Sequence, residues 1–98
     1  MNITKSQEDT SLIISVEGRL DAQTSPVLQD EIAACLDQIE KLTLDLENVD
    51  YVSSAGLRVI IWTQKAMNSK NGLILKKVCP AVMDVFNMTG FSNILTFE

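Results

Sequence analysis

Apolar and polar residues alternate along several stretches of the chain, and this alternation predicts β-strands. The clearest cases are residues 11–17 and 42–46, where every second side chain is apolar. Residues 1–6 precede a polar turn at 7–10, so they are expected to form an edge strand that pairs with 11–17 as a hairpin. The 11–17 strand is expected to end at Gly18. Apolar runs at 73–78 and 93–97 predict two further strands.

Between these strands the apolar residues recur at helical spacing. Thr24-Ser25-Pro26 places a hydroxyl cap before a proline, a pattern typical of a helix start, and predicts a helix to about Gln38. Its apolar stripe consists of Leu28, Ile32, Cys35, Leu36 and Ile39. A second helix is expected from Ser53-Ser54 to about Lys70, with Asn71-Gly72 at its C-cap. A short third helix is expected over 81–88.

The predicted element order is therefore ββαβαβαβ, within one domain that spans residues 1–98. Strands joined by helices favour right-handed crossovers, so the fold class is α/β. We expect a mixed, mostly parallel sheet of about five strands with three to four helices. Loops at the carboxyl ends of parallel strands carry function in such folds, which places the Asp21 loop and the Ser54 loop on one rim.

Two hydroxyls lie where the 42–46 strand region gives way to the second helix. Ser53 or Ser54 is well placed as an N-cap, with its oxygen accepting a backbone N–H of the first turn. A phosphate on an exposed hydroxyl there would face the positive end of the helix dipole. The local pattern leaves both interpretations open, a capping serine and a modified serine.

The second helix carries two apolar stripes where one would serve to face a sheet. One stripe consists of Leu57, Ile60 and Ile61, and the other of Val59, Trp62 and Ala66. Arg58, Thr63 and Lys65 are expected on a polar side. The second stripe is either buried by a neighbouring helix or forms a partner surface with Trp62 as an aromatic anchor.

Charge and composition exclude several classes of function. The net charge is −5 without a run of Lys or Arg, which argues against nucleic acid and against an anionic membrane surface as partners. This acidic balance suits a basic protein partner, or serves solubility alone. No apolar stretch reaches the ~20 residues of a membrane span and the first residues lack the pattern of a signal peptide, so we expect no membrane insertion and a cytoplasmic location.

The chain has few residues suited to catalysis or metal binding. It has no histidine, and Cys35 and Cys79 lie far apart, so no metal site is expected. Neither Ser53 nor Ser54 has a Lys or His close in sequence to activate it, and no Gly-rich phosphate loop is present. The sequence predicts a binding module without a cofactor rather than an enzyme.

Three landmarks in order along the chain resemble the STAS family, the sulfate transporter and anti-sigma factor antagonist domains. The first is Gly18-Arg19-Leu20-Asp21 after a strand. The second is Ser53-Ser54-Ala55-Gly56-Leu57 after a Leu-x-Leu-Asp-Leu strand and a Val-Asp-Tyr loop. The third is Pro80 to Phe86 followed by Thr89-Gly90. The resemblance covers nearly the whole chain.

The resemblance implies a function in partner switching. Similar stand-alone domains are anti-anti-sigma factors: unmodified, they bind an anti-sigma factor that is also a serine kinase, and after phosphorylation they release it until a serine phosphatase resets them. Matching Gly56-Leu57 to the family motif places the modified residue at Ser54, with Asp21 near it on the same rim. With Trp62 of the second stripe added, the expected partner surface consists of Asp21, Ser53, Ser54, Ala55, Gly56, Leu57, Arg58 and Trp62.

One position departs from the switching pattern. Many switching members carry Asp immediately before the modified serine, whereas this chain has Ser53, which becomes a second candidate for phosphorylation. Ala55 replaces a hydroxyl residue common in the family, which favours Ser54. The alternative role is a non-switching STAS subunit of a transporter, lipid-transport or signalling complex. Nucleotide binding at the rim formed by the Asp21 and Ser54 loops has no support in the sequence beyond the position of these loops. We expect the protein to be a monomer.

Overall fold

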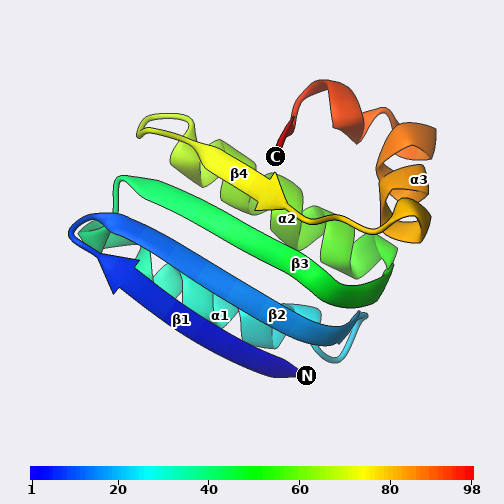
Figure 1. Cartoon of the computed structure of the whole chain (residues 1–98), viewed down its shortest axis with the longest axis horizontal. Helices are drawn as coiled ribbons and strands as arrows, with labels where there is room; N and C mark the ends of the chain where they lie inside the picture. Colours follow the sequence, from blue (N-terminus) through cyan, green and yellow to red (C-terminus); the bar gives the residue numbers. More distant parts are fainter.

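The chain folds into one five-stranded sheet with helices along one face (Figure 1). The computed structural model describes residues 1–98. In chain order the elements are β1 (Asn2–Glu8), β2 (Ser11–Leu20), α1 (Ser25–Cys35), β3 (Lys41–Val52), α2 (Ser54–Met67), β4 (Leu73–Lys76), α3 (Pro80–Thr89) and β5 (Thr96–Phe97). Short 3-10 turns at Leu36–Gln38 and Phe91–Asn93 complete the chain.

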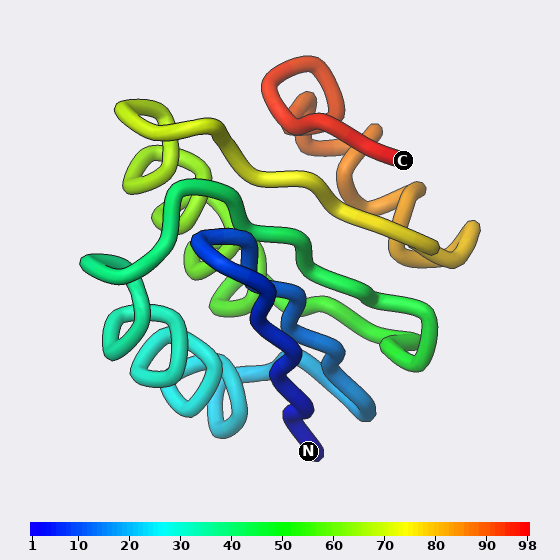
Figure 2. The backbone as a smooth tube through the Cα atoms, turned by 60° about the vertical axis from the view of Figure 1, so that its left-hand side comes forward, coloured from blue at the N-terminus to red at the C-terminus, as the bar shows by residue number.

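The strands lie in sequence order, β1 to β5, across the sheet. β1 and β2 pair antiparallel, and every later pair is parallel. Because each crossover steps in the same direction, right-handed connections place α1 and α2 on the same face. Figure 1 shows both helices behind the sheet, and Figure 2 shows α1 standing off the strands in a second layer. The predicted α/β class, mixed sheet and element order are confirmed.

The core lies between the sheet and these two helices. Alternate residues of β2 and β3 are buried, with Leu12, Ile14, Leu42 and Leu44 at 2% exposure or less. The residues between them, such as Ile13, remain exposed or half-buried on the uncovered face of the sheet. The period of two in the sequence therefore marks which face of the sheet carries the helices.

β2 and β3 run further than the alternation predicts. β2 continues through Gly18 to Leu20, because Gly18 adopts a φ of +118° at a point where the pairing with β3 shifts register. β3 continues past the expected end at Leu46 to Val52, so the segment predicted as a Val-Asp-Tyr loop is a strand. These extensions bring both strands to the serine junction.

Several helices and strands end at other residues than the sequence predicts. α2 ends at Met67 with Asn68 as its C-cap, not at Lys70, and Gly72 adopts a φ of +96° in the following turn. β4 ends at Lys76 and β5 contains only two residues. Thr24 holds the N-cap position of α1, but its side chain makes no capping hydrogen bond.

α3 lies past the carboxyl end of β4 (Figure 1). Its Phe86 is fully buried and meets Phe97 of β5 edge-on, with ring centroids 5.6 Å apart. Gly90 ends α3 in the left-handed conformation that a helix C-terminus favours. No helix is both long and apolar enough to cross a membrane.

Candidate functional site

The carboxyl ends of β2 and β3 meet at the start of α2. The backbone N–H of Ser53 donates to the carbonyl of Leu20 at 2.8 Å, which ties the two strand ends together. The Asp21 loop therefore begins directly beside the serine junction. The arrangement of strands thus brings the Asp21 and Ser54 loops, predicted on one rim, to adjacent positions.

The two serines of the junction have different environments. Ser53 is the N-cap of α2, and its hydroxyl oxygen accepts a hydrogen bond from the Gly56 N–H at 3.3 Å. Ser54 is the first residue of the helix and its side chain is exposed. Its hydroxyl takes no part in the cap, so it is the serine that a second protein can reach.

Gly56 allows the first turn of α2 to lie against the end of β2. A β-carbon at this position would lie 3.0 Å from the β-carbon and the carbonyl oxygen of Leu20, and 3.0 Å from a methyl group of Val52. Contacts this short force neighbours in a packed core to move. The glycine of the motif therefore sets how closely the helix approaches the strand ends.

The Asp21 carboxylate organises its own loop. Its Oδ1 accepts hydrogen bonds from the backbone N–H groups of Thr24 and Gln23, each at 3.0 Å. The Thr24 hydroxyl accepts the Asp21 N–H at 3.0 Å and donates to the Arg19 carbonyl at 2.5 Å. The Thr24 N–H, with smaller contributions from Gln23, the Thr24 hydroxyl and the Arg19 charge, holds the pKa of Asp21 below its ordinary value.

An aromatic and a basic residue lie together on the same rim. The Arg19 guanidinium carbon is 4.1 Å from the ring centroid of Tyr51, a cation–π distance. The two residues face each other in the β2–β3 pairing, and Tyr51 is 41% exposed. Sequence reasoning missed this pair because the register shifts that align them leave no signal in the hydrophobic pattern.

The outer face of α2 continues the site along the helix. Arg58 is exposed, Trp62 is half-buried, and neither Arg58 nor Lys65 forms an ion pair. A hollow of about 460 Å³ lies on the α1 side, lined among others by Ser25, Arg58 and Trp62. Another of about 330 Å³ lies toward the 91–93 turn, lined by Arg58, Ile61, Trp62, Lys65 and Phe91. Arg58 and Trp62 form the ridge between the two hollows.

The second apolar stripe of α2 is only partly buried, and its role as a partner surface stays a prediction. Val59 is buried where α1 and α2 pack together, whereas Trp62 and Ala66 are half-buried. Thr63, predicted on the polar side, is fully buried and donates its hydroxyl to the Val59 carbonyl at 2.8 Å. A threonine can lie on the buried face of a helix when its hydroxyl donates to a backbone carbonyl of the preceding turn in this way.

Burial also changes the role of two residues predicted to contact a partner. Gly56 and Leu57 are both buried, so they shape the junction from beneath instead of forming its surface. Ser54 and Arg58 are exposed, and Asp21, Ser53, Ala55 and Trp62 are half-buried. The surface available to a partner is thus the Ser54 end of α2 and its Arg58/Trp62 ridge.

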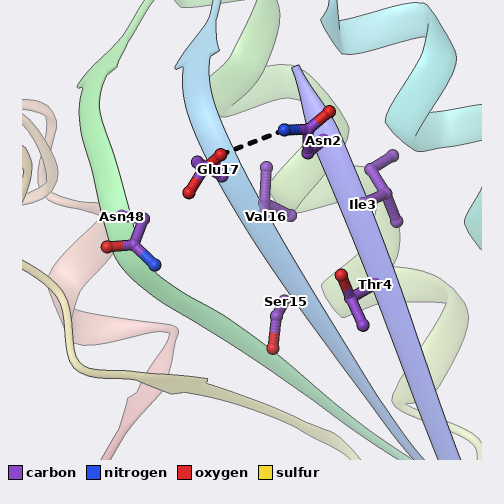
Figure 3. A pocket seen from close by; sticks show the side chains of 7 residues that line it. All are labelled: Asn2, Ile3, Thr4, Ser15, Val16, Glu17 and Asn48. Atoms are coloured by element: carbon purple, nitrogen blue, oxygen red, sulfur yellow. Dashed lines mark hydrogen bonds between the residues drawn. The ribbon is translucent and has the colours of Figure 1, made fainter.

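A separate depression of about 440 Å³ lies on β1, β2 and β3, at the shift of register between Ser15 and Glu17 (Figure 3). Figure 3 shows the amide of Asn2 reaching the carboxylate of Glu17, a hydrogen bond of 3.0 Å, with Asn48 on the neighbouring strand. The one carboxylate of this depression is therefore already bonded. The serine junction, where a free hydroxyl and an unpaired cation lie together, is the candidate functional site.

The junction presents polar and aromatic groups at the surface. No group of three or more His, Cys, Asp or Glu side chains lies close enough to hold a metal ion. The junction offers the exposed Ser54 hydroxyl, Arg58 guanidinium and Tyr51 ring, together with the half-buried ring of Trp62. Such a set is typical of a protein-binding surface.

Comparisons with known proteins identify the family of the chain. A family model described as "Mlab, STAS domain" matches residues 3–96. BtrV of Bordetella bronchiseptica, whose name provisionally places it among the anti-sigma factor antagonists, is 36% identical over 96 residues, which cover 96% of this chain and 83% of BtrV. The anti-sigma-B factor antagonist of Bacillus subtilis is 26% identical over 96 residues, covering 97% of this chain and 88% of that protein.

Solved structures show the same fold. The crystal structure of an anti-sigma factor antagonist from Mycobacterium paratuberculosis superimposes with a TM-score of 0.89 at 24% identity, covering 99% of this chain and 84% of that one. The unphosphorylated form of the anti-sigma factor antagonist SpoIIAA superimposes with a TM-score of 0.84 at 16% identity, covering 99% and 88%. Given the family match over nearly its whole length, the chain belongs to the STAS domain family.

Proposed function

We propose that this protein is an anti-sigma factor antagonist that works as a phosphorylation-controlled partner switch. Unmodified, it binds an anti-sigma factor that is also a serine kinase. Phosphorylation of Ser54 releases that partner, and a serine phosphatase restores binding. It acts in the cytoplasm as a binding protein without catalytic activity of its own.

The observation that carries the proposal is that only one of the two serines, Ser53, is used as the helix cap. Ser53 caps α2, so the helix is complete without the Ser54 hydroxyl, which is exposed on the rim. The names of the relatives support the choice of partner, since both BtrV and the Bacillus subtilis protein are named anti-sigma factor antagonists. SpoIIAA, which shares the fold, has been solved in a phosphorylated form as well as an unphosphorylated one.

Electrostatics supports release without unfolding. A phosphate adds about −1.5 to −2 charges at pH 7 and is tolerated at a helix N-terminus, where the dipole is positive. At an interface that excludes water the same charge is unfavourable, and Asp21 nearby adds to the repulsion. The expected consequence is loss of the partner with retention of the fold.

The test uses the purified chain, the anti-sigma kinase of the same host and ATP. We expect one phosphate at Ser54 and at least about a tenfold loss of affinity for the kinase after modification. Ser54→Ala should remain bound and unmodified. Ser53→Ala is the matched control, because it removes the neighbouring hydroxyl and should still be phosphorylated at Ser54. Phosphate on Ser53, or binding that phosphorylation leaves unchanged, would contradict the proposal.

The alternative is a constitutive STAS subunit of a transporter, lipid-transport or signalling complex. The observation that favours it is Ser53, which stands where many switching members have Asp. In that role Ser54 belongs to a permanent interface. The same experiment separates the two roles, because a constitutive subunit binds its partner equally well before and after exposure to the kinase and ATP.

A further inference from the structure

The hollow between α1 and α2 is lined by a cation that forms no ion pair and by a hydroxyl that has no hydrogen-bond partner in the chain. Arg58 lines it, is exposed and forms no ion pair. Ser25, the first residue of α1, lines it with 1% of its surface exposed, and the hydroxyl oxygen of Ser25 is buried without a hydrogen-bond partner. Buried hydroxyls in folded proteins are almost always paired, and no other residue of the chain pairs with this one.

The remaining walls define the size and character of what enters. Trp62 and Val59 provide apolar sides, and Gln29 adds an amide. Ala22 and Ala55 carry small side chains that leave the hollow open, with a volume of about 460 Å³. A group with an apolar stem and a negatively charged end matches this combination, because both Arg58 and Ser25 are hydrogen-bond donors.

We propose that this hollow receives an acidic side chain of the anti-sigma partner, whose carboxylate pairs with Arg58 and, after rotation of the serine side chain, accepts a hydrogen bond from Ser25. The inference rests on the proposed function and adds the chemistry of the partner. Because the chain as a whole carries a net charge of −5, an acidic side chain is favoured at this cation and disfavoured over most of the surface. The hollow therefore fixes the position of the partner on the rim.

The position of Arg58 connects this hollow to the switch. Arg58 lies four residues after Ser54 on α2, and residues at this spacing are neighbours on a helix surface. A phosphate on Ser54 would compete with the partner carboxylate for the same guanidinium. Phosphorylation then acts twice: it adds negative charge to the rim and withdraws Arg58 from the hollow.

The test measures the affinity of the host anti-sigma kinase, held in ADP to prevent phosphoryl transfer, for variants of the full chain. Arg58→Met should weaken binding at least about tenfold, as expected when one member of a desolvated charge pair is removed. Lys41→Met is the matched control, because Lys41 is an exposed lysine at the start of β3, at the opposite end of that strand from the serine junction. It should change the affinity less than about threefold.

Two further measurements define the contact. Ser25→Ala should weaken binding about threefold or more without lowering the thermal midpoint of the free chain, since the hydroxyl is unpaired there. Acidic residues of the kinase are then changed one at a time to the corresponding amides. One of these changes should weaken binding to the wild-type chain and have little further effect on Arg58→Met, a non-additivity that identifies the contacting pair.

The inference is overturned if Arg58→Met and Ser25→Ala both bind like the wild type, or if every acidic substitution adds fully to Arg58→Met. That result differs from failure of the proposed function. If only this inference fails, the wild-type chain still binds the kinase and is released by phosphorylation. If the proposed function fails, the wild-type chain shows no binding or no release, whatever residue stands at position 58.

Discussion

The two adjacent serines of the junction differ in their contacts. Ser53 satisfies a backbone N–H of the first turn of α2, and Ser54 leaves its hydroxyl exposed. A modification of Ser53 would remove the cap, whereas a modification of Ser54 leaves the cap in place. In the proposed switch, this separation would allow phosphorylation to change binding without changing the fold.

Substitution of the two serines by alanine should therefore affect stability differently. Ser53→Ala is expected to lower the free energy of unfolding by about 1 kcal/mol, because it removes the N-cap acceptor. Ser54→Ala should change it by less than about 0.5 kcal/mol, as is usual for an exposed position. Urea unfolding of both variants measures the difference. Equal losses of stability would show that Ser53 is not the effective cap.

Asp21 should make stability depend on pH in the acid range. Its pKa is lowered in the folded chain, so its stabilising contribution is complete above the unfolded value of about 4 and is lost as the pH falls through the lower folded value. Asp21→Asn keeps an acceptor oxygen but does not titrate. We expect thermal unfolding of the wild type to lose more stability between about pH 4.5 and pH 2 than the variant does.

Asp37→Asn provides the control for this pH series. Asp37 is an exposed carboxylate on the 3-10 turn after α1, and it accepts no side-chain hydrogen bond. Its pH profile should follow that of the wild type. A profile of Asp21→Asn that also coincides with the wild type would contradict the role of Asp21 in its loop.

At the residue scale, the sequence predicted the position of the serine junction but not which of its serines caps the helix. The motif Ser-Ser-Ala-Gly-Leu located the junction and was compatible with either Ser53 or Ser54 as the N-cap. Only the hydrogen bond to Gly56 identifies Ser53 as the cap. The burial of Thr63 and the pairing of Arg19 with Tyr51 depend on contacts between distant segments, which periodicity does not report.

At the scale of elements, Lys70 connects the ends of the two helices that cover the sheet. Its ammonium group donates to the carbonyls of Leu36 and Ile39, both at 2.7 Å, beyond the end of α1. Carbonyls at a helix C-terminus lack partners within the helix and attract cations. A lysine just after α2 thus completes the end of α1.

Loss of this connection should destabilise the chain. Lys70→Met keeps the apolar stem and removes the donor, so we expect a loss of about 1–2 kcal/mol in the free energy of unfolding. Lys41→Met is a suitable comparison, because Lys41 is exposed and makes no side-chain hydrogen bond. It should remain within about 0.5 kcal/mol of the wild type. Equal effects of the two substitutions in chemical denaturation would argue against this role of Lys70.

The hydrophobic pattern predicts the positions of β2 and β3 but not where these strands end. Alternation located β2 and β3 correctly because their buried residues keep a strict period of two from Leu12 and Leu42 onward. The alternation breaks at the register shifts near Glu17 and Gly18, so the last residues of both strands resembled loops in the sequence. These irregular ends are the segments that form the rim.

At the scale of the whole molecule, strand order determines which loops can cooperate. Because the strands follow one another across the sheet, the ends of β2 and β3 are neighbours and their loops form one surface. One phosphate would change the net charge from −5 to about −7, most of it concentrated on this surface. We expect the partner to respond to this change while the five-stranded sheet remains as it is.

The central claim is that Ser54 is the modified residue of a switch, and the intact mass of the protein isolated from its own host tests it most directly. The mass should show a fraction carrying one phosphate, mapped to Ser54 and absent in Ser54→Ala, and this fraction should vary with growth conditions. A mass that remains unmodified under every condition in which the anti-sigma kinase is present would contradict the claim and favour a constitutive subunit.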